Sequence, residues 1–313
     1  YLEDGSCVPV DKSELPIKLP DDVDLKSSGN PLEKHPNWKK TIHKETGKAA
    51  TRETDTLDTF VDSSWYFLRF CSPNNNKKPF DNEKVNYWMP VDQYIGGIEH
   101  AILHLLYSRF FMKAIKKCDD KINYSEPFKN LFTQGMVCHE TYKDQNNKWL
   151  YPDEIEKTST KEATKKSDKS KVLIGPSESM SKSKKNTIDP ETMIEQYGAD
   201  AVRWFILSDS PPEKDIQWSD NGVMSSNKFL QKIWNLNQLI LKGTESKSNS
   251  KEEEFSNKID LYVYKINSSI NHFQFNVAIA QFYEVYGYFN DSIKKEINNK
   301  ILSESLIKIM KLM

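Results

Sequence analysis

The chain has 313 residues, of which 37 % are hydrophobic, and this length is enough for a sizeable core in roughly two domains. Its 44 basic and 45 acidic side chains nearly cancel, so a surface that binds nucleic acid has to be a local patch. No stretch approaches the roughly 18 consecutive apolar residues of a membrane-spanning helix, so we expect no membrane partner. An aromatic content of 12 % argues against wholesale disorder.

The four cysteines are widely spaced and include no C-x-x-C pair. This usage favours reduced thiols and a cytoplasmic location over a disulfide framework. The chain begins at Tyr1 without a signal-peptide pattern and stops at Met313 inside an apolar periodic run. We therefore expect a piece of a longer protein.

Residues 1–56 contain five prolines and little periodicity, so we predict an irregular segment with short strands at most, such as one at 15–19. Dense aromatic residues follow, and Asp62 or Ser63 is expected to cap a helix that begins there.

Phe60, Ser63 and Tyr66 lie three residues apart. This spacing fits either an aromatic stripe in the core or one wall of an apolar pocket that carries two hydroxyls. No nucleophile-elbow pattern surrounds Ser63, so a hydrolase triad is not favoured.

A glycine pair, Gly96-Gly97, stands between a predicted strand from residue 91 and a predicted helix of about 16 residues. That order is typical of α/β nucleotide sites, where the backbone NH groups of the helix N-terminus face the ligand. Glu99 is suited to accept a hydrogen bond from a ribose hydroxyl, or it simply caps a tight turn. Residues 132–137 are predicted as another short strand.

His100 and His104 stand four residues apart, a spacing that suggests zinc. However, Glu99 precedes both histidines instead of lying between them, and no third ligand is apparent. We therefore predict no metal at this position.

The lysine-rich segment at residues 177–186 places Lys182, Lys184 and Lys185 among small hydroxyl side chains. Lysines on a mobile loop suit a polyphosphate, because each ammonium is a compact charge on a flexible stem. The alternative is a solvated basic linker, since residues 156–185 hold nine lysines and only four acids. A helix over 190–204 is predicted to follow.

The C-terminal part is predicted to be helical. Periodic apolar residues mark helices over 225–242 and over most of 255–313, separated by a polar run at 243–258. This pattern indicates a helical bundle.

Five separated blocks resemble bacterial-type leucyl-tRNA synthetases, and they occur in that family's order. The most distinctive is Y-I-G-G-I-E-H-A-I-L-H-L-L-Y, which the related isoleucyl and valyl enzymes are not expected to carry. The five blocks are residues 58–69, 94–110, 180–184, 197–200 and 215–218.

The resemblance implies an α/β fold that comprises the second half of a class I Rossmann-type catalytic domain followed by an α-helical bundle. It implies ATP and Mg²⁺, with leucine and tRNA(Leu) as the other partners, in an enzyme expected to be monomeric. Leucine would attack the α-phosphate of ATP, and the tRNA ribose would then attack the adenylate. Catalysis would consist of positioning and charge stabilisation.

The resemblance also implies roles for individual residues. Lys182 would stabilise the departing pyrophosphate, with Lys184 and Lys185 nearby as further catalytic lysines. Met136 and Val137 would offer their backbone to the adenine. The implied ATP-binding residues are Gly96, Gly97, Glu99, His100, Met136, Val137 and Lys182, and those of the leucine pocket are Phe60, Ser63, Tyr66 and His100.

The chain departs from the family pattern in three ways. Ser179 replaces the first lysine of the family's loop motif, so Lys182, or its lysine neighbours, must carry more of the charge. His43 and Thr46 stand where some relatives carry a zinc-binding C-x-x-C, so we predict no zinc. The H-I-G-H motif and the editing stretch, which lie N-terminal in the family, are absent, so we expect a fragment that is inactive alone.

The resemblance divides the chain into five predicted segments. The first two are an irregular connection and the second half of the catalytic domain. A leucine-specific insertion, a lysine-loop and stem-contact region, and an incomplete anticodon-binding bundle complete the prediction. Their expected bounds are 1–56, 57–140, 141–174, 175–222 and 223–313.

Two other functions remain open on the sequence. The basic patch and the helical part together also fit a non-catalytic tRNA-binding module, whose affinity would depend steeply on salt. A sister class I synthetase for isoleucine, valine or methionine would share the fold, and amino-acid specificity would distinguish it.

Overall fold

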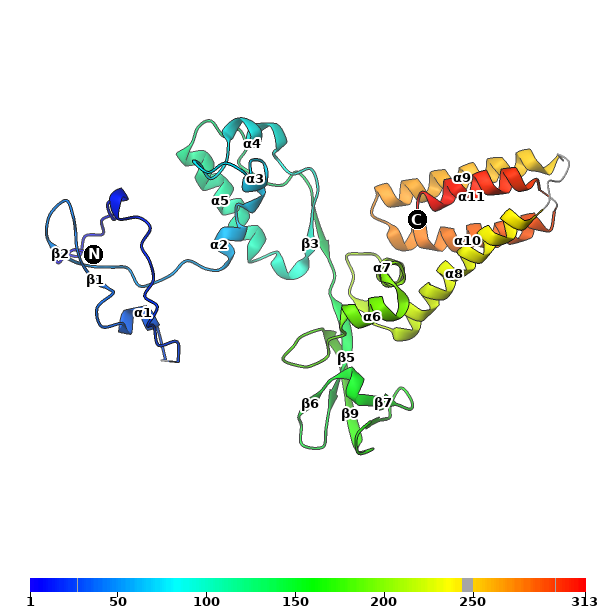
Figure 1. Ribbon diagram of the computed structural model, residues 1–313, viewed down its shortest axis with the longest axis horizontal. Helices are drawn as coiled ribbons and strands as arrows, with labels where there is room; N and C mark the ends of the chain where they lie inside the picture. The colour runs from blue at the N-terminus through cyan, green and yellow to red at the C-terminus, as the bar shows by residue number, and fades with distance from the viewer. Residues whose placement is uncertain (27, 244–249, 296) are drawn as a thin grey trace. The chain divides into compact units, whose positions relative to one another are not determined.

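The computed structural model describes residues 1–26, 28–243, 250–295 and 297–313. The chain divides into two units, the first formed by residues 1–87 and 104–125 and the second by residues 88–103 and 126–313 (Figure 1). Each unit is described by itself.

The first unit begins with a segment of little regular structure. A two-stranded antiparallel sheet joins β1 (Lys40–Ile42) to β2 (Ala49–Thr51), and two short helical turns are η1 (Lys12–Glu14) and α1 (Pro31–Lys34). The irregular character is confirmed, but the suggested strand at 15–19 is wrong. Pro16 and Pro20 lack the backbone NH that a strand ladder uses.

The rest of the first unit is helical. The helix expected to start at Asp62 or Ser63 is split in two, and neither residue caps it. The Ser63 and Ser64 hydroxyls both donate to the Phe60 carbonyl, at 3.0 and 2.5 Å, and such local bonds compete with the helical ladder. The helices are α2 (Phe60–Ser63), α3 (Tyr66–Phe70), α4 (Asn82–Trp88), whose last residue belongs to the second unit, and α5 (His104–Cys118).

In the second unit, β3 (Tyr94–Gly97) pairs in parallel with β4 (Leu131–Gln134). The single strand expected at 132–137 is divided between two strands, because the extended pairing of β4 ends before Gly135 and β5 (Val137–Lys143) begins after it. The Gly135 NH donates to the Pro212 carbonyl at 2.9 Å, and a Cβ on Gly135 would collide with the Lys214 backbone. Glycine permits this close approach of two backbones.

β5 pairs with three other strands of a six-stranded mixed sheet (Figure 1). It pairs in parallel with β10 (Ile216–Gln217) and antiparallel with β9 (Lys171–Ser179). Residues 141–174, predicted as an insertion, fold mainly as short antiparallel strands. These are β6 (Trp149–Leu150), β7 (Ile155–Lys157) and β8 (Ala163–Lys165), with the turn η3 (Pro152–Glu154) between the first two.

The helix predicted over 190–204 is also split. α6 (Pro190–Tyr197) and α7 (Ala199–Ser208) meet at Gly198, whose φ of 85° and ψ of 149° end the first helix. This conformation is open essentially to glycine alone.

Four helices form the predicted bundle (Figure 1). The first begins at Asp220 instead of residue 225, because the Ser219 hydroxyl caps it by accepting from the Gly222 NH at 3.1 Å. The stretch expected as mostly helix over 255–313 is three helices, and the first of them already begins at Lys251, so the predicted polar separator at 243–258 is too long. Residues 244–249 of that separator lie outside the described residues. The helices are α8 (Asp220–Lys242), α9 (Lys251–Asn271), α10 (Phe275–Ile293) and α11 (Asn299–Met310).

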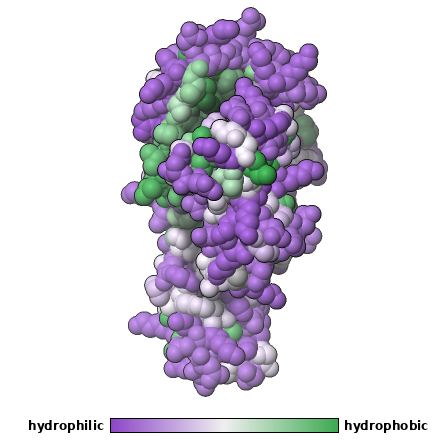
Figure 2. Space-filling model, turned by 90° about the vertical axis from the view of Figure 1, so that its left-hand side faces the viewer, coloured by the Kyte–Doolittle hydropathy of each residue, from purple (hydrophilic) through white to green (hydrophobic). Residues whose placement is uncertain are grey.

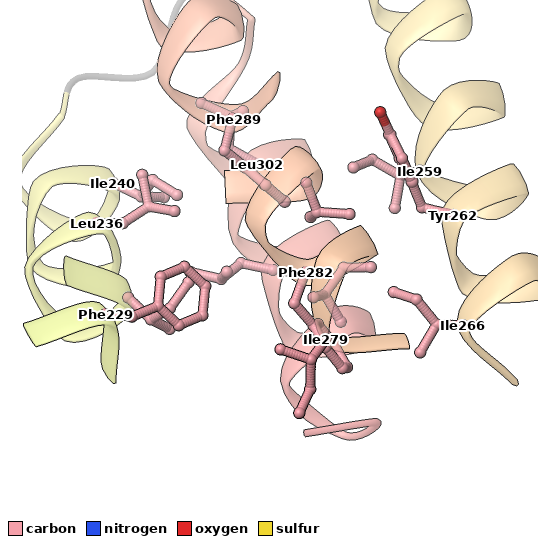
Figure 3. Close-up of a cluster of buried hydrophobic side chains, with 14 of the residues drawn as sticks. Phe229, Leu236, Ile240, Ile259, Tyr262, Ile266, Ile279, Phe282, Phe289 and Leu302 are labelled. Carbon is pink, nitrogen blue, oxygen red and sulfur yellow. The ribbon is translucent and has the colours of Figure 1, made fainter. Parts of the chain in front are cut away.

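The bundle has the largest described apolar core in the chain, with each helix contributing side chains (Figure 3). Phe255, Ile259, Ile266 and Phe289 are at most 1 % exposed. Burial of this extent stabilises a helix more than its intrinsic propensity does.

Large apolar side chains also remain open to solvent, and Figure 2 shows green residues lying among hydrophilic ones on one face. In the first unit, Phe70, Tyr87 and Phe110 are each more than 60 % exposed. None of the described helices is long and apolar enough to cross a membrane.

Candidate functional site

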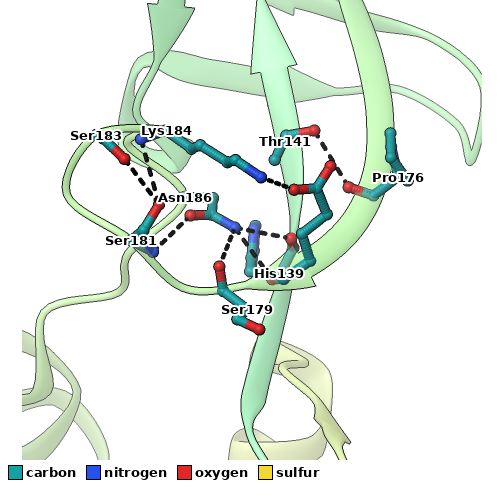
Figure 4. A network of polar contacts seen from close by, with 9 residues as sticks. His139, Thr141, Pro176, Ser179, Ser181, Ser183, Lys184 and Asn186 are labelled. Atoms are coloured by element: carbon teal, nitrogen blue, oxygen red, sulfur yellow. Dashed lines mark hydrogen bonds and ion pairs between the residues drawn. The ribbon is translucent and has the colours of Figure 1, made fainter. Parts of the chain in front are cut away.

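The lysine loop, residues 180–186, leaves the end of β9 and precedes α6 (Figure 4). Its first residue is tied to the neighbouring strand, since the Met180 NH donates to the Val137 carbonyl at 3.1 Å. Before it, Ser179 and Glu178 lie opposite Cys138 and His139. The loop is therefore an extension of a paired strand, which fits a site better than it fits a solvated linker.

The three lysines of the loop have different surroundings. The Lys184 ammonium forms an ion pair with the Glu178 carboxylate. Lys185 has a left-handed backbone, with φ of 55°, and its Nζ lies 4.9 Å from the centroid of the Tyr151 ring. Lys182 is exposed and lines a hollow of about 620 Å³. Of the three predicted catalytic lysines, Lys182 is thus the one whose side chain is both exposed and beside a hollow.

Ser179, which replaces the first lysine of the family motif, is exposed at the last position of β9. It lies opposite Cys138, where burial, aided by the Asp215 charge, raises the pKa of the thiol. No cation stands at position 179, so Lys182, Lys184 and Lys185 supply all three positive charges of the loop.

The glycine pair ends β3, and a short turn, η2 (Ile98–His100), follows it. The predicted long helix does not start directly after the pair, because α5 begins only at His104, and the helical element that follows Gly97 is the single turn η2. The carboxylate of Glu99 folds back over Gly97, where any Cβ would collide with it. Glu99 Oε1 also lies 3.8 Å from His100 Nε2.

Met136 and Val137, the predicted adenine contacts, are held by the mixed sheet. The Met136 NH donates to the Asp215 carboxylate and its carbonyl accepts from the Ile216 NH, both at 2.8 Å. The Val137 carbonyl receives the Met180 NH. These bonds connect the predicted adenine segment directly to the start of the lysine loop.

The predicted leucine-pocket residues Phe60, Ser63 and Tyr66 belong to the first unit, whereas His100 belongs to the second. The Phe60 ring stacks near Tyr107 with centroids 6.5 Å apart, and the Tyr66 ring lies 6.2 Å from His104. Both aromatic residues therefore face α5.

The residues suspected of binding zinc do not form a metal cluster. His104 is only 9 % exposed and packs inside the first unit, while His100 lies in the second. His43 Nδ1 lies 2.9 Å from Thr46 Oγ1. Within the described residues, no group of three histidine, cysteine or acidic side chains is close enough to hold a metal.

Sequence reasoning missed one polar residue at this site. Asn186 is 0 % exposed, although its amide is fully polar. The available signal was its position directly after the third lysine, but no pattern indicated that this asparagine would be buried.

Comparison with known proteins gives matches in the same region. Residues 170–219, which include β9, the lysine loop, α6 and α7, match the model of class I tRNA synthetases for I, L, M and V. The chain is 48 % identical over 296 residues to a leucine–tRNA ligase of Rickettsia bellii, covering 95 % of this chain and 35 % of that protein. It is 52 % identical over 236 residues to that of Rhodospirillum rubrum, covering 75 % and 27 %.

Comparison with solved structures also gives matches to aminoacyl-tRNA synthetases. The ternary LeuRS-tRNA-LeuAMS complex of Agrobacterium radiobacter K84 agnB2 matches all of this chain and 37 % of its own, with TM-score 0.75 and 31 % identity. A methionyl-tRNA synthetase of Mycobacterium tuberculosis in complex with methionyl-adenylate, at TM-score 0.50 and 16 % identity, covers 80 % of this chain and 44 % of its own and shares the fold alone.

The chain spans about a third of the length of the curated relatives it matches. The matched fold is the second half of a class I Rossmann-type catalytic domain followed by a helical bundle, as the sequence predicted. With these matches the chain belongs to the leucyl-tRNA synthetase family of class I synthetases.

Proposed function

We propose that the chain carries the lysine-loop side of the active site of a leucine–tRNA ligase. The enzyme would join leucine to the α-phosphate of Mg²⁺-bound ATP with release of pyrophosphate, and then pass the leucyl group to the terminal ribose of tRNA(Leu) with release of AMP. In this proposal the Lys182 ammonium stabilises the negative charge that develops on the pyrophosphate.

The observation that carries the proposal is the placement of Lys182. Lys184 is paired with Glu178 and Lys185 lies over Tyr151, whereas Lys182 lines an open hollow on a loop that is tied to β5. A flexible ammonium on a fixed loop can follow a phosphate as it moves. Gly96, Gly97, Glu99, His100, Met136 and Val137 are proposed to contact the nucleotide.

The amino-acid site is proposed to include Phe60, Ser63, Tyr66 and His100. Phe60 and Tyr66 offer apolar surface, which suits a leucine side chain. Because an apolar pocket rejects one methylene only about 10- to 200-fold, the proposal concerns activation and not the full accuracy of the enzyme. We also propose a cytoplasmic monomer without structural zinc.

Leucine-dependent exchange of pyrophosphate into ATP tests this function. The full-length synthetase that contains this chain should catalyse exchange with leucine, and at least tenfold less with isoleucine, valine or methionine at equal concentration. The chain alone should show no leucine-dependent exchange. A full-length enzyme that prefers another amino acid would point to a sister synthetase, and one that binds tRNA without any exchange would point to a non-catalytic RNA-binding module.

A further inference from the structure

Asn186 is the most deeply buried polar side chain of the lysine loop, with 0 % of its surface exposed (Figure 4). Its Oδ1 accepts from the Ser181 NH at 2.9 Å, which closes the loop on itself. Its Nδ2 lies within hydrogen-bond distance of three backbone carbonyls, those of His139 at 3.2 Å, Glu178 at 3.1 Å and Ser179 at 3.3 Å.

These bonds connect three parts of the chain. His139 is on β5, Glu178 and Ser179 are on β9, and Ser181 is inside the loop. The two ends of the loop are therefore fastened to the same point of the sheet. Because buried polar groups without partners are costly, removal of this amide would be unfavourable: the Ser181 NH would lose its acceptor, and the three carbonyls would lose a nearby donor.

The other polar contacts described for the loop involve the backbone of Lys182 but not its side chain. Lys184 is paired with Glu178, its NH lies 3.4 Å from the Ser181 hydroxyl, and the Lys185 NH donates to the Lys182 carbonyl at 3.3 Å. These contacts fix the backbone that surrounds Lys182, while the Lys182 side chain is exposed beside its hollow.

We propose that Asn186 is a positioning residue that sets the loop so that the Lys182 ammonium reaches the reacting phosphates. This inference rests on the proposed function. Asn186 touches no substrate in this account, and it acts only through the backbone it holds. Asparagine suits the position because one amide supplies both an acceptor for the Ser181 NH and donors for the carbonyls.

Asparagine and aspartate have nearly the same shape, so Asn186→Asp changes chemistry more than volume. The carboxylate can still accept from the Ser181 NH, but it has no hydrogen to donate and brings a charge against three carbonyl oxygens. We expect Asn186→Asp to lower kcat of leucine-dependent exchange at least tenfold, with the KM for leucine changed less than threefold.

A double-mutant cycle with Lys182→Ala separates positioning from general damage. If Asn186 acts through Lys182, the double variant should be no more than threefold slower than Lys182→Ala alone. Rate losses that multiply would overturn the inference, and so would an Asn186→Asp enzyme within threefold of the wild type. Asn146→Asp, at an exposed position in the turn between β5 and β6, is the matched control and should leave the rate unchanged.

Amide hydrogen exchange tests the positioning role of Asn186 independently of the proposed enzymatic function. In the full-length protein the Ser181 NH should exchange at least tenfold faster in Asn186→Asp than in the wild type, and unchanged exchange would overturn the inference whatever the activity. Asn186→Ser, which keeps a smaller donor and acceptor, serves if the aspartate variant does not fold. If the wild-type enzyme showed no leucine-dependent pyrophosphate exchange at all, that result would instead contradict the proposed function.

Discussion

The helical bundle and the lysine loop are held in place by different forces. The bundle has a continuous core of buried apolar side chains from α8 to α11. The loop, by contrast, depends on one buried amide, an ion pair and a few backbone hydrogen bonds. Burial is not directional, whereas hydrogen bonds fix particular atoms.

The difference shows what each region contributes. A bundle that is stabilised by buried apolar area tolerates small changes in side-chain shape, because the hydrophobic free energy is roughly proportional to the apolar area removed from water. A loop that is held by a few polar contacts has a defined geometry, but few other contacts stabilise it when one of them is lost. We therefore expect substitutions in the bundle to change the free energy of unfolding most, and substitutions near the loop to change activity most.

The largest expected effect on stability is in the bundle. Phe289 is 0 % exposed, and its ring lies 5.6 Å from that of Phe255. We expect Phe289→Ala to lower the free energy of unfolding by about 3–5 kcal/mol, since it removes transfer energy and leaves a cavity. Urea titration followed by circular dichroism measures this. Tyr264→Ala, at a position 71 % exposed on α9, is the control and should change it by less than about 0.5 kcal/mol.

The second-largest expected effect on the free energy of unfolding concerns the backbone between the lysine loop and the bundle. Gly198, with φ of 85°, separates α6 from α7, and Gly198→Ala should cost about 1–3 kcal/mol of unfolding free energy. Gly287→Ala is the matched control, because Gly287 lies inside α10 and a Cβ there meets nothing within 4 Å. That change should stabilise by about 0.5–1 kcal/mol. Equal signs for the two substitutions would contradict this explanation.

The smallest expected effect is in the mixed sheet. Burial tends to raise the pKa of Glu140, but hydrogen bonds from Lys157 at 2.6 Å and Tyr142 at 2.9 Å outweigh it and lower that pKa. A carboxyl with a lowered pKa contributes stability above its unfolded-state pKa and loses it as the pH falls.

Between about pH 5 and pH 3 the wild type should therefore lose up to about 1 kcal/mol that Glu140→Gln does not lose, a modest value because the pair is partly solvated. Urea titrations at both pH values measure the difference. Glu253→Gln, at an exposed position of α9, should follow the wild type. A glutamine variant with unchanged acid sensitivity would show that the pair contributes nothing.

The sequence predicted the large features because each has a repeating cause. The bundle follows from apolar residues such as Phe282 and Val285 at helical spacing, and both are buried. Element ends were less predictable. The breaks at Gly135 and Gly198 depend on a backbone that approaches from residue 214 and on a backbone angle, and neither leaves a periodic signal.

The candidate site was predictable only in part. Lysine spacing located the loop, but not which lysine points outward, because this depends on Glu178 and Tyr151 as partners. Asn186 was not predicted, since its burial arises from the pairing of β5 with β9. The expected helix after the glycine pair forms, but it starts later than predicted, at His104, because residues 98–100 form a separate turn.

The most direct test of the account is the effect of Lys182→Ala on leucine-dependent pyrophosphate exchange by the full-length synthetase. Loss of one preorganised charge should cost about 2–4 kcal/mol of transition-state stabilisation, or roughly 30- to 900-fold in rate. Lys161→Ala, an exposed lysine of the same basic patch, should leave the rate unchanged. A Lys182→Ala enzyme within threefold of the wild type would contradict the proposed role of the lysine loop.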